Sequence, residues 1–414
     1  MKNKRNQEAL DYHSRFPTGK IQMTPTKNYL EQKELSLAYS PGVAEACRAI
    51  TQYPQNAYDW TSKGNLVAVV SNGTAVLGLG NIGALASKPV MEGKGLLFKV
   101  FAGVDVFDIE ISENETESFI KVVKAISPTF GGINLEDIKA PEAFEIERRL
   151  KKELDIPVMH DDQHGTAIIS VAALINSLEF VGKNIETIKL VVNGAGAAAI
   201  SCTRFYKKLG VRAANIFMFD RKGIICIERN DLTKEKKEFA VKIKNNINLE
   251  EALKGADVFI GLSVANILTP EMLLTMENDP ILFSLANPDP EIRYDIAIKT
   301  RTDAIVATGR SDFPNQVNNV LGFPYIFRGA LDVQSITINE EMKLAAVFAI
   351  ARLAKEKSIG KENIIPRPFD NRLITKIAVA IAKAAIKSGV ARKTINNWNS
   401  YEEYLLERRG IKTL

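Results

Sequence analysis

The stretch that decides the fold of this chain is Lys189-Leu190-Val191-Val192-Asn193-Gly194-Ala195-Gly196-Ala197-Ala198-Ala199. Its apolar beginning predicts a short buried strand, and the residues after the glycines predict a helix that runs to about Leu209. In the pattern G-x-G-x-x-A, Gly194 permits a tight turn, Gly196 lets the backbone approach a pyrophosphate, and Ala199 permits close packing of helix on strand. Strand, turn and helix in this order predict a dinucleotide-binding loop. Its expected contacts are Gly194, Ala195, Gly196, Ala197 and Ala198.

The next predicted strand, Ile216–Phe219, is followed by an acidic residue, Asp220. Asp220 lies near the offset of about 20 residues at which dinucleotide-binding folds place a carboxylate for the ribose. It would bind the 2′-hydroxyl of NAD and repel the 2′-phosphate of NADP, whereas Arg221 and Arg310 could accommodate that phosphate. The residues therefore leave the choice between NAD and NADP open.

From about Leu66 onward, short β-branched runs alternate with helical periods. This alternation is typical of an α/β fold, with parallel sheets covered by helices on both faces. The predicted strands are Leu66–Val70, Val104–Ile109, Ile156–Met159, Lys189–Val192, Ile216–Phe219, Val258–Ile260, Ile281–Leu285 and Ala304–Val306. The predicted helices include Glu115–Ile126, Pro141–Leu154, Thr166–Phe180 and two C-terminal helices with one apolar stripe each, Asn339–Lys357 and Arg372–Ser388.

The length of 414 residues suits two domains. We place their boundary near Asp162–Thr166, where a strand is expected to end in a polar loop before a long helix. Residues 1–162 would then form an N-terminal α/β lobe. Residues 163–414 would form a Rossmann-type, doubly wound parallel sheet, with the C-terminal helices packed back on the chain.

Composition excludes several classes of protein. Hydrophobic residues make up 46% of the chain and charged residues 25%, as in a folded globular protein. The net charge of +5 is small, and even the dense run 234–238 alternates in sign, so we expect a solvated helix face there and no nucleic-acid partner. The longest weakly polar stretch, 66–86, is broken by glycine and asparagine, which argues against a membrane span. Three distant cysteines and an N-terminus without an apolar segment predict a cytoplasmic protein.

Two acidic clusters, 131–137 and 160–166, are expected at strand ends before the boundary. Adjacent carboxylates at the edge of a parallel sheet are costly unless a positive charge lies between them, and oxygen ligands suit Mg²⁺ or Mn²⁺. The alternative is helix capping: Asp161 or Asp162 could cap a helix near Thr166, and Asp137 the helix at Pro141. Spacing alone leaves both interpretations open.

Three other residue types in this part of the chain invite a catalytic interpretation. His160 and His164 are four residues apart, but the Asp-Asp-Gln between them and Gly165, which suggests a loop, disfavour a zinc site. Lys94 could act as a general base if its surroundings lower its pKa. Tyr39 precedes a rigid Ser-Pro-Gly turn. Taken singly, each of these residues is more often structural than catalytic.

Together these stretches resemble the bacterial malic enzymes over nearly the whole chain. The set in its order is far more specific than any one motif. The matching segments are Tyr12–Pro17, Gly19–Ile21, Ser36–Ala44, Gly73–Gly83, Lys88–Lys94, Gly131–Ala140, His160–Thr166, Gly194–Ala199, Ala286–Pro288, Gly309–Asp312 and Asn315–Val320.

The resemblance implies oxidative decarboxylation of malate to pyruvate and CO₂, with NAD or NADP and with Mg²⁺ or Mn²⁺. It also implies a homodimer or a larger homo-oligomer, and we expect the N-terminal lobe to build the dimer. Tyr39 could then act either in its own chain or in the site of the neighbouring chain. The roles that it implies are a general base at Lys94, a general acid at Tyr39, metal ligands at Glu136, Asp137 and Asp162, a supporting residue at Asp161, and contacts to substrate or nicotinamide from Asn287 and Asn319.

Two departures and two alternatives accompany this interpretation. Larger eukaryotic relatives have an arginine where this chain has Ala75, which leaves open how one malate carboxylate is bound. Some bacterial relatives continue into a phosphotransacetylase-like domain, so the chain is either a stand-alone form or part of such a hybrid. The alternative functions are a metal-dependent 2-hydroxy-acid dehydrogenase without decarboxylation and an inactive nucleotide-sensing module.

Overall fold

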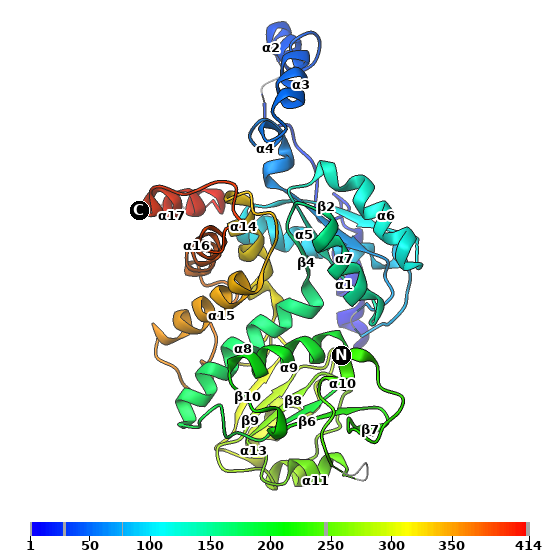
Figure 1. Ribbon diagram of the computed structural model, residues 1–414, viewed down its shortest axis with the longest axis vertical. Coiled ribbons are helices and arrows are strands. Elements are labelled where there is room, and N and C mark those ends of the chain that lie inside the picture. Colours follow the sequence, from blue (N-terminus) through cyan, green and yellow to red (C-terminus); the bar gives the residue numbers. More distant parts are fainter. Residues whose placement is uncertain (1, 28–29, 77, 244–246, 411–414) are drawn as a thin grey trace.

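The computed structural model describes residues 2–27, 30–76, 78–243 and 247–410 of the chain (Figure 1). Two sheets and a group of C-terminal helices form the body of the molecule, and a short arm of helices projects from one end (Figure 1). The α/β class predicted from the sequence is confirmed.

The first sheet has four parallel strands in the order β2-β1-β3-β4. Alternate side chains of the central strand enter two cores: Val67 and Val69 face α5, and Ala68 and Val70 face α6 and α7. A parallel strand covered on both faces has no polar side, which explains its continuous apolar run. The elements are β1 (Leu66–Ser71), β2 (Asp105–Glu110), β3 (Gly132–Leu135), β4 (Val158–His160), α5 (Ala84–Ala102), α6 (Thr116–Ile126) and α7 (Glu142–Glu153), with short 3-10 turns η1 (Ser62–Asn65) and η2 (Ser127–Thr129).

The second sheet has the order β10-β9-β8-β5-β6-β7, parallel except for β7. The chain runs outward from β5 to one edge and from β8 to the other, so the strand order reverses between these two strands. Open α/β sheets bind ligands at such a reversal. The elements are β5 (Leu190–Asn193), β6 (Ile216–Asp220), β7 (Gly223–Ile224), β8 (Val258–Gly261), β9 (Ile281–Ser284), β10 (Ile305–Thr308), α9 (Ala197–Leu209), η3 (Ala213–Asn215), α10 (Lys234–Lys237), α11 (Leu249–Leu253), α12 (Pro270–Leu274) and α13 (Tyr294–Thr300).

Helix α8 (Asp161–Val181) connects the two sheets and packs against α9 and α15. It is the one helix in the described part of the chain that is long and apolar enough to cross a membrane, but most of its apolar window is buried inside the molecule. The C-terminal helices pack back on the first sheet, where the buried Arg328 bonds to Asp332 and to Asn65. These elements are η4 (Asn319–Leu321), α14 (Phe323–Asp332), α15 (Glu340–Lys355), α16 (Arg372–Lys387) and α17 (Trp398–Arg408).

The arm consists of helices that bury none of their own side chains. Figure 1 shows α2 and α3 beyond the body of the molecule, with α4 nearer to it. Large apolar side chains along the arm are exposed, among them Leu37, Tyr53 and Trp60. The arm helices are α2 (Gln32–Ala38), α3 (Val43–Gln52) and α4 (Asn56–Trp60), and α1 (Lys2–Ser14) precedes them.

All eight predicted strands are present, with ends shifted by at most two residues, and β3 and β7 were not predicted. The polar loop expected at 162–166 is wrong, because α8 begins at Asp161 directly after β4. Gly165 therefore lies inside a helix and not in a loop. The boundary between 162 and 163 falls in the first turn of α8, and the division of the chain there stays a prediction.

Candidate active site

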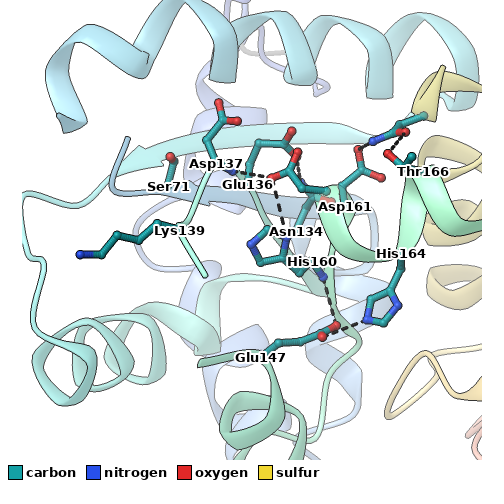
Figure 2. Close-up of polar contacts among 12 residues, drawn as sticks. Ser71, Asn134, Glu136, Asp137, Lys139, Glu147, His160, Asp161, His164 and Thr166 are labelled. Carbon is teal, nitrogen blue, oxygen red and sulfur yellow. Dashed lines mark hydrogen bonds and ion pairs between the residues drawn. The ribbon is translucent and has the colours of Figure 1, made fainter. Parts of the chain in front are cut away.

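Three carboxylates meet at the carboxyl edge of the first sheet. Glu136 and Asp137 follow β3, and Asp162 lies in the first turn of α8, after the neighbouring strand β4. One oxygen of each lies within 4.8 Å of the others, and the Asp137 amide donates to Asp162 Oδ2 at 2.8 Å. Because β3 and β4 are parallel neighbours, their ends bring together residues far apart in the sequence. The predicted cluster is therefore assembled (Figure 2).

Lys94 reaches this cluster from the middle of α5. Its Nζ lies 2.9 Å from Glu136 Oε1 and also contacts Asp161 Oδ2. Burial lowers the pKa of Lys94, but the negative charges of Asp161 and Glu136 outweigh this effect and hold the pKa above its usual value. The expectation of a lowered pKa is therefore wrong for the site without a bound cation, because these carboxylates stabilise the ammonium form.

Asp161 is the fully buried member of the acidic group. Its Oδ2 accepts a hydrogen bond from Asn319 Nδ2 at 3.2 Å, and Thr166 donates to Asn319 Oδ1 at 3.0 Å. Its Oδ1 has no hydrogen-bond partner and faces Gly165, where an added Cβ would lie 2.1 Å from that oxygen. Glycine is required inside α8 because the Asp161 carboxylate occupies the space of a side chain.

The capping interpretation of these carboxylates is wrong. Helix α8 has His160 as its N-cap residue, and α7 has Pro141. None of the three aspartates caps either helix: Asp137, Asp161 and Asp162. The cluster instead suits a divalent cation, since all of its donors are oxygens. Burial and the charge of Asp162 raise the pKa of Glu136 well above its usual value. A cation would remove that repulsion, so the residues present fit Mg²⁺ or Mn²⁺.

The two histidines of the 160–164 stretch do not share a site. His164 Nε2 lies 2.9 Å from Glu147 Oε2, and the Lys343 ammonium lies 3.3 Å from His164 Nδ1. Burial lowers the pKa of His164 to about 4, and the charge of Lys343 adds to the effect. A neutral His164 can donate to Glu147 and accept from Lys343. The zinc interpretation, already disfavoured, gains no support from this arrangement.

The glycine-rich loop lies between β5 and α9, as predicted. A Cβ on Gly194 would lie 2.4 Å from the Leu262 carbonyl oxygen, so this position requires glycine. No atom lies within 4 Å of a Cβ built on Gly196, the N-cap of α9, and no side chain caps that end of the helix. Gly196 therefore keeps space open above the first-turn amides of Ala197 and Ala198, where a pyrophosphate fits. Ala199 is buried, as close packing demands.

Asp220 ends β6, as predicted, but its carboxylate is already occupied. Arg229 donates to both of its oxygens, at 2.8 and 3.0 Å, and Lys236 donates to Oδ2 at 2.7 Å. Burial raises the pKa of Asp220, but the hydrogen bonds from Arg229 and Lys236 outweigh this and lower it to about 2. The adjacent Arg221 is exposed. The local charge beside β6 is therefore positive, in contrast to the repulsive carboxylate expected from the sequence.

Arg310 and Asn287 lie at the other end of the second sheet. Arg310 follows β10, four strands from β6, which is roughly 19 Å at the usual strand spacing of about 4.8 Å. Its Nη1 donates to the Pro288 carbonyl oxygen at 3.2 Å. A Cβ on Gly78 would lie 3.3 Å from the Asn287 carbonyl oxygen, so the loop after β1 meets the loop after β9. Arg310 is therefore remote from Asp220 in the second sheet, and its accommodation of a 2′-phosphate stays a prediction.

Tyr39 is not joined to the cluster within the chain. It is the C-cap residue of α2 on the projecting arm, and 73% of its surface is exposed. Figure 1 shows α2 well beyond the sheet whose edge carries the carboxylates. The described residues therefore bring together Lys94, the acidic group and Asn319, but not Tyr39.

Glu147 and Arg229 contribute to these sites but were not singled out from the sequence, and Gly165 was interpreted only as a sign of a loop. Gly165, directly before the helix predicted from Thr166, could have signalled the close approach of another side chain. Glu147, on α7, and Arg229, in the segment after β7, have no such local signal, because they act on residues of other elements. Leu77, within the 73–83 motif, lies outside the described residues.

Comparison with known proteins covers both sheets. The family described as "Malic enzyme, N-terminal domain" matches residues 18–151. The family described as "Malic enzyme, NAD binding domain" matches residues 163–387. The second match identifies a nicotinamide-dinucleotide-binding domain, as the loop at Gly194 predicted.

Similar proteins extend this result. The NADP-dependent malic enzyme of Haemophilus influenzae is 55% identical over 97% of this chain, but the chain spans only 55% of that protein. The NADP-dependent malic enzyme of Halomonas elongata is 51% identical, over 95% of this chain and 96% of its own length. The crystal structure of malic enzyme from Pyrococcus horikoshii superimposes with a TM-score of 0.91 at 47% identity, over 98% of this chain and 96% of that one. Because the two domain matches account for most of the sequence and the similarity extends through the whole fold, this chain belongs to the malic enzyme family.

Proposed function

We propose that this protein is a cytoplasmic enzyme that oxidises malate and decarboxylates it to pyruvate and CO₂, with reduction of a nicotinamide dinucleotide. The observation that supports this most directly is Lys94 held against Glu136 and Asp161 beside the carboxylate cluster. The cluster lies in the same molecule as a dinucleotide loop at the strand-order reversal of the second sheet. The chain spans about half the length of the first curated relative, so the activity is inferred from these residues together with family membership.

The protein groups divide the reaction between them. Lys94 would accept the proton of the C2 hydroxyl, and a bound nicotinamide would supply the acceptor for the C2 hydride. The C4 carboxylate then leaves as CO₂, and Tyr39 donates a proton to C3 of the resulting enol. Asn319 orients Asp161, and through it the amine of Lys94, because its amide is fixed between Asp161 and Thr166.

We assign Mg²⁺ or Mn²⁺ to Glu136, Asp137 and Asp162. A divalent cation there would supply Lewis-acid stabilisation of the charge that develops on the substrate oxygen, and its charge would offset the carboxylates that raise the pKa of Lys94. The support is the donor set itself, three carboxylate oxygens within 4.8 Å of one another.

For the cofactor we propose NADP in preference to NAD. The pairing of Asp220 with Arg229 and Lys236 removes the carboxylate that would repel a 2′-phosphate. Arg221, exposed at the end of β6, can pair with that phosphate. Asn287, on the loop after β9, is placed for the nicotinamide end or the substrate.

We further propose a two-fold dimer in which the arm supplies Tyr39 to the partner's site. None of the described side chains of α2 and α3 is buried within the chain, and Leu35, Leu37 and Val43 are exposed; exposed apolar patches of this kind mark interfaces. A closed dimer uses the same surface on both chains, so each arm would complete the other site. Without such an exchange, Tyr39 stays remote from Lys94.

The test is steady-state kinetics with malate, Mn²⁺ and each cofactor, with pyruvate, oxaloacetate and CO₂ measured together. We expect pyruvate, CO₂ and reduced cofactor in equal amounts, with no accumulation of oxaloacetate. Oxaloacetate without CO₂ would indicate a 2-hydroxy-acid dehydrogenase. Cofactor binding without any turnover would indicate a nucleotide-sensing module.

A further inference from the structure

His160 is a polar side chain that neither the fold nor the proposed chemistry explains. It is the last residue of β4, and its side chain is fully buried. Neither ring nitrogen has a hydrogen-bond partner. Buried polar groups are almost always paired, so an unpaired imidazole at this place requires a reason.

A carboxylate of the cluster lies just beyond hydrogen-bond distance of the His160 ring. His160 Nδ1 lies 3.7 Å from Asp162 Oδ2, beyond a hydrogen bond, which for nitrogen and oxygen has a usual length of about 2.9 Å. A movement of roughly 0.8 Å would close the gap. Asp162 is the partner able to move, since 36% of its side chain is exposed whereas the His160 side chain is enclosed.

The backbone of His160 is fixed from two sides. Glu147 Oε1 accepts its amide hydrogen at 3.1 Å, and the strand register places His160 opposite Leu135, the residue before Glu136. Asn134, on the same strand β3, already donates to Glu136 Oε2 at 3.0 Å. Figure 2 shows the His160 ring beside Asn134, beneath Glu136. Glu136 thus has a side-chain donor beneath it. Asp162 Oδ2 already accepts from the backbone amide of Asp137, and His160 is placed to add a side-chain donor to the same oxygen.

We propose that His160 is a positioning residue for the divalent cation: it donates from Nδ1 to Asp162 and aims the other carboxylate oxygen at the ion. The inference rests on the proposed metal site at Glu136, Asp137 and Asp162. Side chains that hydrogen-bond to metal-ligating carboxylates typically change metal affinity by 10–100-fold when removed. Replacement of a purely structural histidine would change the stability of the fold but not its affinity for the divalent cation.

The experiment measures Mn²⁺ binding by calorimetry on the full chain without substrate or cofactor, beside thermal unfolding of each variant. In His160→Asn the side-chain amide nitrogen lies where Nδ1 lies in histidine, so the proposed donor is kept. In His160→Gln the amide nitrogen corresponds to Nε2 instead, and His160→Leu has no donor at all. We expect the Kd for Mn²⁺ to rise 10–100-fold in the Leu and Gln variants and to stay within about threefold of wild type in the Asn variant. The control is His164→Gln, which changes a mostly buried histidine in the first turn of α8 that bonds to Glu147; its Tm should fall while its Kd for Mn²⁺ stays near wild type.

Each outcome decides something. Equal Mn²⁺ affinity in wild type and His160→Leu would overturn the positioning role and leave the proposed function intact. If the Leu variant does not fold, the comparison of Asn with Gln decides, and equal affinity in these two overturns the role. A wild-type chain that binds no Mn²⁺ would instead overturn the metal-dependent function, and this inference with it.

Discussion

The amide of Asn319 hydrogen-bonds to the carboxylate of Asp161 across 158 positions of sequence, at 3.2 Å. Asn319 opens the turn η4 that leads into α14, and Asp161 opens α8. The bond therefore joins the segment after the second sheet to the edge of the first. It also leaves Asp161 Oδ2 shared between Asn319 and Lys94, so the position of the proposed base depends on a residue from the far end of the chain.

Gly165→Ala should inactivate the enzyme although alanine favours helices. The new Cβ would lie 2.1 Å from Asp161 Oδ1 and 2.9 Å from Asn319 Cγ, so both side chains must shift. We expect kcat to fall about 10²-fold, the scale of a 1 Å misplacement. Gly93→Ala in α5 is the matched control, because its Cβ meets nothing within 4 Å. That variant should keep its activity and be neutral or more stable by up to about 1 kcal/mol in urea unfolding.

Removal of the divalent cation should abolish turnover. Chelation should stop pyruvate formation, and added Mg²⁺ or Mn²⁺ should restore it, because the proposed reaction needs a Lewis acid at the carboxylates. Asp162→Asn should weaken Mn²⁺ binding in calorimetry, whereas Glu142→Gln, a partly exposed carboxylate outside the cluster that pairs with Lys139, should not. Full activity in excess chelator would contradict the metal assignment.

Mixing two inactive variants tests the exchange of arms. Lys94→Ala should lose both oxidation of malate and decarboxylation of added oxaloacetate, and Tyr39→Phe should lower kcat by roughly 10²–10⁴-fold. If Tyr39 acts in the partner's site, subunits mixed after mild dissociation form heterodimers with one intact site, and activity reappears. A mixture that stays inactive, or a monomer in light scattering, would show that each chain uses its own tyrosine.

Cofactor selectivity should depend on Arg221 and not on Arg310. Arg221→Ser should raise KM for NADP and leave KM for NAD nearly unchanged, since only the phosphate of NADP needs the guanidinium. Arg310→Ser is the comparison, because Arg310 lies four strands from β6. A selective effect on NADP from Arg310→Ser would contradict this placement of the cofactor.

The ion pairs of Asp220 should stabilise the fold in a defined range of pH. The hydrogen bonds from Arg229 and Lys236, which outweigh burial, lower its pKa from 3.8 to about 2. A lowered carboxyl pKa stabilises the folded state above about pH 4, and the contribution is lost as pH falls toward 2. In urea unfolding at pH 5–7, the free energy of unfolding of wild type should exceed that of Asp220→Asn by about 1 kcal/mol, a figure that allows for solvent screening. This difference in unfolding free energy should shrink below pH 4. If it grew there instead, the pKa of Asp220 would be raised in the folded state and not lowered.

The sequence predicted most strands because a β-branched apolar run is a local property. The sequence did not predict β3, which begins with Gly132. Packing against α14 favours glycine at this position, because a Cβ there would lie 3.2 Å from the Phe327 ring. The sequence failed at α5 for a similar reason. Pro89 and Gly95 suggest helix breaks, yet Gly95 lets the helix approach Val106, with 3.3 Å between a built Cβ and the nearest valine methyl.

The site, like the fold, was predicted only in part. Family resemblance named Lys94 and the acidic residues, and the structure brings them together as a group. Local sequence could not show that Arg229 pairs with the Asp220 carboxylate. A side chain that contacts the end of a strand from another segment leaves no periodic pattern in the sequence. Local sequence also could not give the sign of the pKa shift of Lys94, which depends on carboxylates from two other segments: Glu136 after β3, and Asp161 and Asp162 at the start of α8.

The exposed arm has a consequence for any assay of this protein. If Tyr39 serves the partner's site, the catalytic unit is the dimer, and a separated chain keeps its cofactor loop and carboxylates but lacks the proton donor. Specific activity should then fall on dilution, with a lag when concentrated enzyme is added to dilute assays, while cofactor binding per chain stays constant. A rate measured at nanomolar enzyme would report the association constant of the arms as much as the chemistry of malate.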